Sequence, residues 1–508
     1  MANEAPATEN VYEALGARLR RIHVLGSVSG LLGWDEQVNL PEGAAGQRAA
    51  QAELLAELNH ASATDAGLGA AITACERLLA AGGLDADARV VVTAARRDYD
   101  RAIKLPVELA AEKARLSSEG YHVWAAARKA RDFSAFAPIL EKHLTLARRE
   151  ADLLGFGERP YDLAIDRHDP GLTAAQIGGL FAELREGLVP LARRIDARVA
   201  AAKARGDGPV ALRGFDVTAQ QCVVRAVTAQ LGFDYRRGRL DVSLHPFCEG
   251  SGDDVRLTTR FNADEPLDAL YSSIHEAGHG LYEQGLPAAH AGTALGVAAG
   301  MAVHESQSRL WENQVARSRA FWRWLEPMMR AKFPKELAGV DGDVLHAAAN
   351  AVEPGGLIRV DADEVHYNLH ILLRFELERR LFDGTLPVAD LPAAWDALST
   401  ELLGRRPGHA GEGVLQDVHW SGGAFGYFPS YTLGNMIAAQ LWTAARRARP
   451  TLEDEFARGE FGGLLAWLRT EVHAHGRRGD AFALTLRVTG EALGPKALLA
   501  YLEERYGK

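Results

Sequence analysis

The sequence predicts a mainly α-helical fold with a minor β-sheet. Over most of the 508 residues, apolar side chains recur at intervals of three and four, the spacing of amphipathic helices. The alternation typical of strands is confined to a short stretch, about residues 240–262. The composition, 47% hydrophobic and 24% charged, is typical of a globular protein rather than a disordered or fibrous one.

Two segments of the N-terminal half show the helical pattern. Residues 109–155 place Ala, Glu, Lys and Arg between the apolar positions, and these residue types favour helix. Thr173 and Gln176 have the spacing of a capping box, after Pro170 and Gly171 have ended the preceding segment. The Gly-, Asp- and Lys-containing stretch 201–209 predicts a loop.

The strand pattern predicts one hairpin. Residues 239–247 and 254–261 both alternate, and the segment CEGSGDD at 248–254 predicts the turn between them. Residues 356–360, GLIRV, are a further strand candidate. No internal repeat or low-complexity tract is apparent.

Charge and cysteine content exclude several classes of protein. A net charge of -10 argues against nucleic acid and anionic membranes as partners, since their binding sites are basic. Three widely spaced cysteines build neither a disulfide framework nor a Cys-rich zinc site. The N-terminal residues lack the apolar segment of a secretory signal, and no stretch approaches the roughly 18 apolar residues of a membrane span. We therefore expect a cytoplasmic protein.

The motif HEAGH, residues 275–279, carries the strongest chemical signal. His275 and His279 stand four residues apart, so on a helix both imidazoles can reach one zinc ion. Glu276 projects about 100° around the helix, where it can take a proton from the attacking water. Gly278 and Gly280 each cost about 1 kcal/mol in a helix interior, which indicates a function or a close approach of another backbone. The alternative is a helix that merely exposes two histidines.

A zinc hydrolase of this type needs a third protein ligand. His304 and Glu305 are both chemically able, but adjacent residues on a helix point about 100° apart. Enzymes in which a glutamate completes H-E-x-x-H take it from a following helix, which favours Glu305. We expect His304 beside the site, as a substrate contact or a hydrogen-bonding partner of a ligand. Ser308, one turn from Glu305, either donates a hydrogen bond to it or is solvated.

Other candidate clusters are weaker. His366 and His370 also stand four apart, but no glutamate follows the first, so a structural role is favoured. His473 and His475 stand two apart and would point to different sides of a helix. The chain has no G-x-S-x-G motif of a serine nucleophile, and Cys248 is interpreted as a small apolar residue.

Eight motifs in one order resemble the carboxypeptidase Taq family of metallocarboxypeptidases. They are LLGWDEQVNLPEGA (31–44), HPF (245–247), DVRLT (254–258), HEAGH (275–279), HESQS (304–308), IRVDAD (358–363), GVLQDVHW (413–420) and GYFPSYTLGN (426–435). The similarity continues to residues 489–507 and covers nearly the whole chain.

The resemblance implies metal ligation by His275, His279 and Glu305, with Glu276 as general base and acid. It also implies a homodimer and a single catalytic domain, residues 1–508, split by a deep substrate groove. Within that domain we expect a helical N-terminal part over about 1–235 and a metal-site part over about 236–508.

The resemblance also assigns residues that bind substrate. Arg359 resembles the family's receptor for the substrate's terminal carboxylate, which a guanidinium meets with two parallel hydrogen bonds. The alternative is a surface salt bridge. Tyr431 and His419 resemble donors to the developing oxyanion, although an aromatic residue also suits a core position. His245, with Asp254 and Arg256, lies in motifs near the groove, where these residues either contact substrate or hold the hairpin.

We therefore expect a metal-dependent carboxypeptidase that acts on peptides with a free terminal carboxylate. Zinc suits two imidazoles and a carboxylate, and cobalt suits the same donors. One alternative is a metallo-oligoendopeptidase of related helical fold, which would not require the free carboxylate. Another is a non-catalytic helical binding protein with a decayed site, although all four motif residues are intact.

Overall fold

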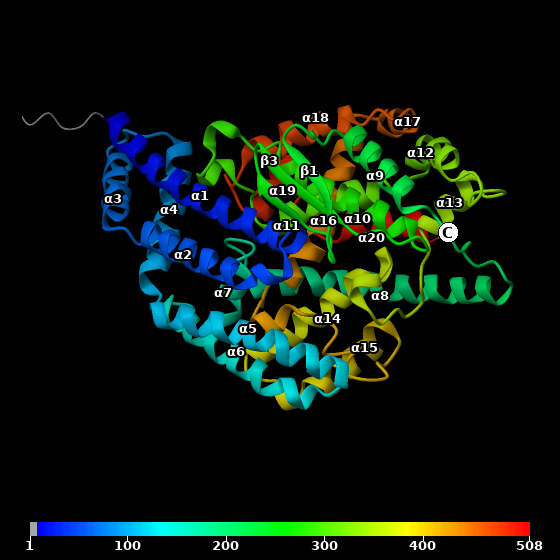
Figure 1. The fold of residues 1–508 in the computed structure, drawn as a ribbon, viewed down its shortest axis with the longest axis horizontal. Coiled ribbons are helices and arrows are strands. Elements are labelled where there is room, and N and C mark those ends of the chain that lie inside the picture. Colours follow the sequence, from blue (N-terminus) through cyan, green and yellow to red (C-terminus); the bar gives the residue numbers. More distant parts are fainter. Residues whose placement is uncertain (1–7, 508) are drawn as a thin grey trace, which may run out of the picture.

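The structure is a computed structural model that describes residues 8–507, most of which lie in α-helices (Figure 1). The α-helices are α1 (Thr8–Val38), α2 (Ala45–Ala63), α3 (Ala66–Ala80), α4 (Ala86–Lys104), α5 (Val107–Ala130), α6 (Phe133–Leu153), α7 (Pro160–Asp166), α8 (Ala174–Ala204), α9 (Val217–Leu231), α10 (Pro266–Glu283), α11 (Met301–Arg309), α12 (Arg319–Lys332), α13 (Gly342–Ala349), α14 (Glu364–Phe382), α15 (Leu391–Leu403), α16 (Phe428–Ala448), α17 (Leu452–Ala457), α18 (Gly462–Glu471), α19 (Ala481–Thr489) and α20 (Lys496–Tyr506). The strands are β1 (Gly238–Val242), β2 (Cys248–Ser251) and β3 (Asp254–Thr259). The predicted fold class, mainly α with a small sheet, is confirmed.

The predicted start of α8 is confirmed as well. The hydroxyl of Thr173 accepts from the backbone N–H of Gln176, and the Gln176 side chain accepts from the backbone N–H of Thr173 at 3.0 Å. Both groups satisfy backbone donors that have no partner inside the helix. The loop predicted at 201–209 is only partly confirmed, because α8 continues to Ala204 and the loop then occupies residues 205–216 before α9 begins.

The sheet differs from the predicted hairpin. Its order is β1-β3-β2, with β1 parallel to β3 and β2 antiparallel to β3. The predicted turn at 248–254 is therefore mostly strand β2, and the hairpin joins β2 to β3. Gly250 and Gly252 at this hairpin have φ of 92° and 60°, a left-handed backbone that glycine adopts readily. β1 reaches the other edge of β3, which its alternating pattern could not reveal.

The further strand predicted at residues 356–360 is wrong. A short 3₁₀ helix at Arg359–Asp361 occupies the end of this segment. Gly355 turns the chain with φ of 63°, and the backbone N–H of Arg359 donates to the side chain of Gln416 at 2.9 Å. This segment thus bonds to a distant loop instead of a neighbouring strand.

Two hydrophobic cores lie in the described chain. The larger spans segments from α5 to α20 and includes the faces of α10, α11 and α16. The smaller lies between α1, α3 and α4 and contains Leu15, Leu68, Ile72, Cys75, Val92 and Ala95. Figure 1 shows these N-terminal helices at one end of the molecule, with α1 running towards the sheet.

The side chain of Trp34, near the end of α1, joins that helix to the sheet. Its ring lies beneath the guanidinium groups of Arg239 on β1 and Arg256 on β3, at 4.9 and 4.3 Å from the ring centroid. Asp254 holds Arg256 through two hydrogen bonds of 2.9 and 3.0 Å. Two of the motifs, LLGWDEQ and DVRLT, thus pack against each other. This favours the structural alternative for Asp254 and Arg256.

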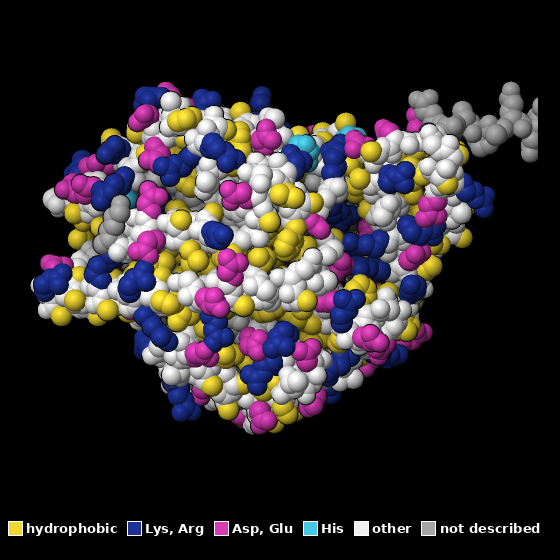
Figure 2. All heavy atoms as spheres, turned by 180° about the vertical axis from the view of Figure 1, so that it is seen from behind, with side chains coloured by type: hydrophobic (Ala, Val, Ile, Leu, Met, Phe, Trp, Pro, Cys, Tyr) yellow, Lys and Arg dark blue, Asp and Glu magenta, His cyan; other side chains and the backbone are white. Residues whose placement is uncertain are grey.

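The surface carries charges of both signs. Figure 2 shows Lys and Arg side chains interspersed with Asp and Glu over the face opposite to that of Figure 1. Among the helices described, none combines the length and apolar character needed to cross a membrane.

Candidate metal centre and active site

Helices α10 and α11 bring the predicted metal ligands together. Nε2 of His275 and Nε2 of His279 lie 3.5 and 3.3 Å from Oε2 of Glu305. One potential ligand atom from each residue falls within 4.8 Å of the others. Glu305 is 3% exposed, so its carboxylate faces the two imidazoles rather than solvent.

These distances match one ion bound by three side chains. Donors about 2.0–2.2 Å from a tetrahedral zinc ion lie roughly 3.3–3.6 Å from one another. The two N–O separations of 3.5 and 3.3 Å fall in that range. Two imidazoles and a carboxylate are also the donor set of a catalytic zinc site with a free fourth position. The donor types and these two separations therefore fit a single bound metal ion.

Glycines on neighbouring helices permit this convergence. A Cβ on Gly278 of α10 would lie 2.6 Å from Cα of Ser308 on α11, so only glycine lets these backbones approach so closely. A Cβ on Gly434 of α16 would lie 2.7 Å from Cγ of Glu305. The expected close approach is thus, at Gly278, to the backbone that carries the third ligand, whereas at Gly280 it is to the side chains of Phe233 and Leu257. Ser308 also donates to Oε2 of Glu305 at 3.0 Å. This is the first of the two alternatives predicted for Ser308.

Charged residues of the next helical turns hold two of the ligands. A π-helical segment, Leu310–Val315, follows α11 and contains Glu312. Glu312 accepts from Nδ1 of His275 at 2.9 Å, while Arg309 donates to Glu305 at 2.7 Å and to Glu312 at 3.1 Å. Burial opposes ionisation of both carboxylates, but the charge of Arg309 and the contacts with neighbouring histidines together outweigh it, and the pKa of each lies below its usual value. Both therefore stay ionised beside the metal position.

The other histidine ligand contacts a second imidazole. Nδ1 of His279 lies 2.5 Å from Nδ1 of His304, and Nε2 of His304 lies 2.8 Å from Oε1 of Glu283. Burial, together with the nearby His304, lowers the pKa of His279 to about 3, so its imidazole is neutral. The structure thus places His304 beside a ligand, as one alternative predicted.

Glu276 lies next to the ligands and is 7% exposed. Among the described residues its carboxylate has no hydrogen-bond partner, in contrast to Glu305 and Glu312. Burial raises its pKa to about 7, partly offset by the nearby His275. A carboxyl group with such a pKa can both take and return a proton near neutral pH.

Arg359 is buried, not part of a surface salt bridge. Its Nε donates to Asp417 at 2.8 Å and its Nη1 to the hydroxyl of Tyr367 at 3.2 Å. Arg374 donates to the other oxygen of Asp417 at 2.7 Å. Two guanidinium groups thus share one carboxylate, which leaves a net positive charge. Tyr367 links this cluster to the metal centre, because the guanidinium of Arg309 lies 4.4 Å from its ring centroid.

The predicted oxyanion donors lie in an aromatic cluster around Arg359. The ring of Tyr431 is 5.4 Å from the Arg359 guanidinium and 5.2 Å from the ring of Tyr427. The ring of His419 is 5.7 Å from that of Tyr427, and its buried Nδ1 has no hydrogen-bond partner among the described residues. Burial lowers the pKa of His419 to about 4. Neutral His419 therefore has one ring nitrogen that can donate a hydrogen bond and one that can accept.

Several candidate residues lie elsewhere. The structure does not bring His245 into the metal group: it is exposed between β1 and β2, and its backbone carbonyl accepts from Ser243 at 2.5 Å. His366 lies between Asp196 and Asp363, at 3.2 and 2.9 Å, which is a structural ion pair. His370 is buried, with Nε2 3.0 Å from the carbonyl oxygen of Gly356, as a structural histidine would be.

Two further predictions concerned His473 and Cys248. His473 is buried, with Nε2 3.0 Å from Oε1 of Gln307. Burial raises the pKa of the Cys248 thiol well above its usual value, so the thiol stays protonated and a poor nucleophile.

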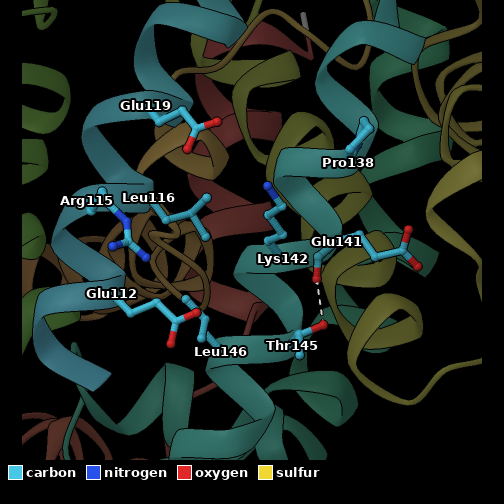
Figure 3. A pocket seen from close by; sticks show the side chains of 9 residues that line it. All are labelled: Glu112, Arg115, Leu116, Glu119, Pro138, Glu141, Lys142, Thr145 and Leu146. Atoms are coloured by element: carbon cyan, nitrogen blue, oxygen red, sulfur yellow. Dashed lines mark hydrogen bonds between the residues drawn. The ribbon is translucent and has the colours of Figure 1, made fainter. Parts of the chain in front are cut away.

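A hollow of about 450 Å³ lies between α5 and α6, away from these residues (Figure 3). Leu116 and Leu146 line it, and charged side chains such as Glu112, Arg115 and Lys142 surround them. It contains none of the predicted site residues.

The sequence motifs did not reveal the groups that hold the ligands, namely Arg309, Glu312 and Glu283, or those that hold Arg359, namely Asp417 and Arg374. Arg309 stands four residues after Glu305, on the same face of a helix, which is a signal that the sequence does contain. Glu312 could not be placed by helical spacing because the π-helical turn shifts it. Tyr427 was overlooked although it lies within the motif that contains Tyr431.

Comparison with known proteins gives a consistent result. The family model described as carboxypeptidase Taq (M32) metallopeptidase matches residues 14–506. The chain is 42% identical to thermostable carboxypeptidase 1 of Thermus thermophilus, over 98% of each protein, and 34% identical to carboxypeptidase 1 of Bacillus subtilis, over 96% of each.

Solved structures agree. The M32 carboxypeptidase from Deinococcus radiodurans R1 is 44% identical with a TM-score of 0.92, covering 98% of this chain and 99% of that one. Trypanosoma cruzi metallocarboxypeptidase 1 is 33% identical with a TM-score of 0.93, covering 98% and 100%. A family model spanning nearly the whole chain, together with the group formed by His275, His279 and Glu305, shows that the chain belongs to the carboxypeptidase Taq (M32) family and is a metallocarboxypeptidase, a peptide hydrolase.

Proposed function

We propose that the protein removes C-terminal residues from peptides with a free terminal carboxylate, using one zinc ion held by His275, His279 and Glu305. The convergence of these three side chains carries the proposal, because their separations suit one ion. When bound, zinc polarises the scissile carbonyl and lowers the pKa of water. Cobalt suits the same donors.

Glu276 supplies the proton transfer. Its carboxylate adjoins the ligands and has no hydrogen-bond partner in the described chain, so it can accept the proton of the attacking water. It then returns that proton to the leaving amine, and the cycle ends with Glu276 ionised again. Tyr431 and His419 would donate hydrogen bonds to the carbonyl oxygen as it gains negative charge.

Arg359 selects the free C-terminus. The cluster of Arg359, Arg374 and Asp417 carries one net positive charge, which a terminal carboxylate would neutralise. Tyr367 contacts both Arg359 and Arg309, so the anchoring cluster adjoins the metal centre. A substrate held at its terminal carboxylate would therefore present its last peptide bond to the metal. An oligoendopeptidase would have no use for this cluster.

Cleavage of matched peptides tests the proposal. The unaltered protein loaded with zinc should shorten a free peptide residue by residue in mass spectra and leave its C-terminally amidated form nearly intact. Arg359→Ala should abolish that preference. Equal cleavage of both peptides by the unaltered protein would refute the proposed selection of a free C-terminus.

Glu276→Gln separates chemistry from metal binding. The variant should bind zinc normally but lose about 10²–10⁴-fold in turnover, the usual contribution of a general base. Near-normal turnover would contradict the assigned role.

The oligomer and the remaining site residues stay predictions. A homodimer rests on the family resemblance and calls for a measurement of mass in solution. His245 stays a predicted substrate contact, although its ring lies outside the group of metal ligands. The predicted substrate groove, domain organisation and cytoplasmic location likewise await direct tests.

A further inference from the structure

His304 lies between His279 and Glu283 and contacts both. Its Nδ1 is 2.5 Å from Nδ1 of His279, and its Nε2 is 2.8 Å from Oε1 of Glu283. The side chains of His304 and Glu283 are 15% and 14% exposed, so both contacts are largely shielded from solvent. We propose that Glu283 and His304 form a relay of hydrogen bonds that positions His279 for metal binding. The proposal rests on the metal site proposed above.

The proton positions follow from what each group can donate. An ionised carboxylate only accepts, so Nε2 of His304 donates to Glu283. Neutral His304 then has a lone pair on Nδ1, which accepts the proton on Nδ1 of His279. This arrangement leaves the lone pair of Nε2 on His279 facing Glu305, as metal ligation requires. The reverse arrangement would put a proton on that Nε2 and exclude the metal.

The relay explains why a histidine directly precedes Glu305. His279 and Glu283 stand one turn apart on α10, and His304 enters between them from α11. The same short helix therefore supplies the third ligand and the group that orients the second. His275 needs no such intermediary, because Glu312 contacts its Nδ1 directly at 2.9 Å.

Two substitutions of His304 separate hydrogen bonding from packing. His304→Asn places a carbonyl oxygen near the position of Nδ1, so His279 keeps an acceptor while the contact with Glu283 is lost. His304→Phe keeps a ring against His279, whose ring centroid lies 4.6 Å away, but offers no acceptor. A relay therefore predicts that Asn preserves metal binding better than Phe, whereas a packing role predicts the opposite.

Zinc affinity, measured by competition with a chromophoric chelator, is the deciding experiment. We expect His304→Phe to weaken affinity by about 10- to 100-fold, the usual effect of losing a group that orients a ligand. His304→Asn should retain most of the affinity. Glu283→Ala alone should weaken zinc affinity. When it is added to His304→Asn it should cause no further loss, because Glu283 acts only through His304. The absorption spectrum of bound Co²⁺ should change in His304→Phe.

Controls keep the outcomes distinct. The metal-free variants must unfold at temperatures near that of the unaltered protein, and His122→Phe on the exposed face of α5 should change nothing. If His304→Phe binds zinc as tightly as the unaltered protein, or more tightly than His304→Asn, the relay is wrong while the metal site stands. If the unaltered protein binds no stoichiometric zinc, the proposed function itself fails, and the relay with it.

Discussion

Replacing Gly278 by Ala should separate the two helices that carry the metal ligands. In most helix interiors this change is favourable by about 1 kcal/mol, because Ala has the higher helix propensity. Here the new Cβ would lie 2.6 Å from Cα of Ser308 and 2.7 Å from the carbonyl oxygen of Gln307. Carbon atoms prefer to be about 3.5–4.0 Å apart, so α10 and α11 would have to move apart by roughly 0.9 Å.

Two consequences can be measured. Overpacking of this kind costs about 1–3 kcal/mol, which outweighs the gain in helix propensity, so the free energy of unfolding should fall. Zinc affinity should fall as well, because the distances between metal and ligands must lie within about 0.2 Å of their ideal values. Glu305 moves with α11 while both histidines stay on α10. Urea unfolding of the metal-free protein reports the first effect, and chelator competition reports the second.

Gly33→Ala is the matched control. Gly33 lies in the interior of α1, where a Cβ would meet nothing within 4 Å. The same substitution should therefore stabilise the protein slightly, by up to about 1 kcal/mol, and leave zinc affinity unchanged. If Gly278→Ala behaved like Gly33→Ala in both measurements, the argument from close backbone contact would be refuted.

Three other changes give distinct results. The ion pairs of His366 raise its pKa from 6.5 to about 10 against the effect of burial, so they add stability below pH 6.5 that is lost as the pH rises through 10. Urea unfolding should show the free energy of unfolding decline by up to about 1.4 kcal/mol per pH unit in this range, and His366→Gln should lack this decline. Equal pH profiles of the two proteins would contradict the ion pairs. Arg309→Met removes the guanidinium partner of buried Glu305 and one of the two guanidinium partners of Glu312, and should cost the metal-free protein about 3–5 kcal/mol, part of which zinc restores. An unchanged unfolding temperature without metal would be inconsistent with the ion pairs. Asp169→Ala removes the carboxylate that accepts from the backbone N–H of Ala302 at 2.7 Å, at the start of α11. In urea unfolding it should lower the free energy of unfolding by about 1–3 kcal/mol. A loss below about 0.5 kcal/mol would show that water replaces the carboxylate.

The two histidine ligands could be predicted from the sequence because helical geometry relates them. His275 and His279 share a face of one helix, whereas Glu305 lies on α11 and was favoured only by comparison with other H-E-x-x-H enzymes. Arg359 required the family resemblance, because nothing in its own segment reveals Asp417 or Arg374 as partners. Those contacts join residues 58 and 43 positions apart, and local patterns carry no such information.

The failures have physical causes as well. The parallel pairing of β1 with β3 depends on the path of residues 243–247, where the hydroxyl of Ser243 bonds the backbone of His245 and takes the chain out of the sheet. Alternation within a strand says which face is buried but not which strand lies beside it. The role of Glu312 depends on a π-helical turn, and such turns have no sequence pattern that distinguishes them from an α-helix.

The charges around the site explain why so many groups surround three ligands. With every histidine neutral and Glu276 deprotonated, the ionised groups of this region are four carboxylates and two guanidinium groups, namely Glu276, Glu283, Glu305, Glu312, Arg309 and Arg317. Their net charge of two negative units matches a divalent cation, and burial makes any excess of charge costly. Arg309 and Arg317 thus limit the repulsion between carboxylates when no metal is bound, while the remaining negative charge favours the ion. Removal of Arg309 should for this reason weaken the metal-free protein more than the zinc-loaded one.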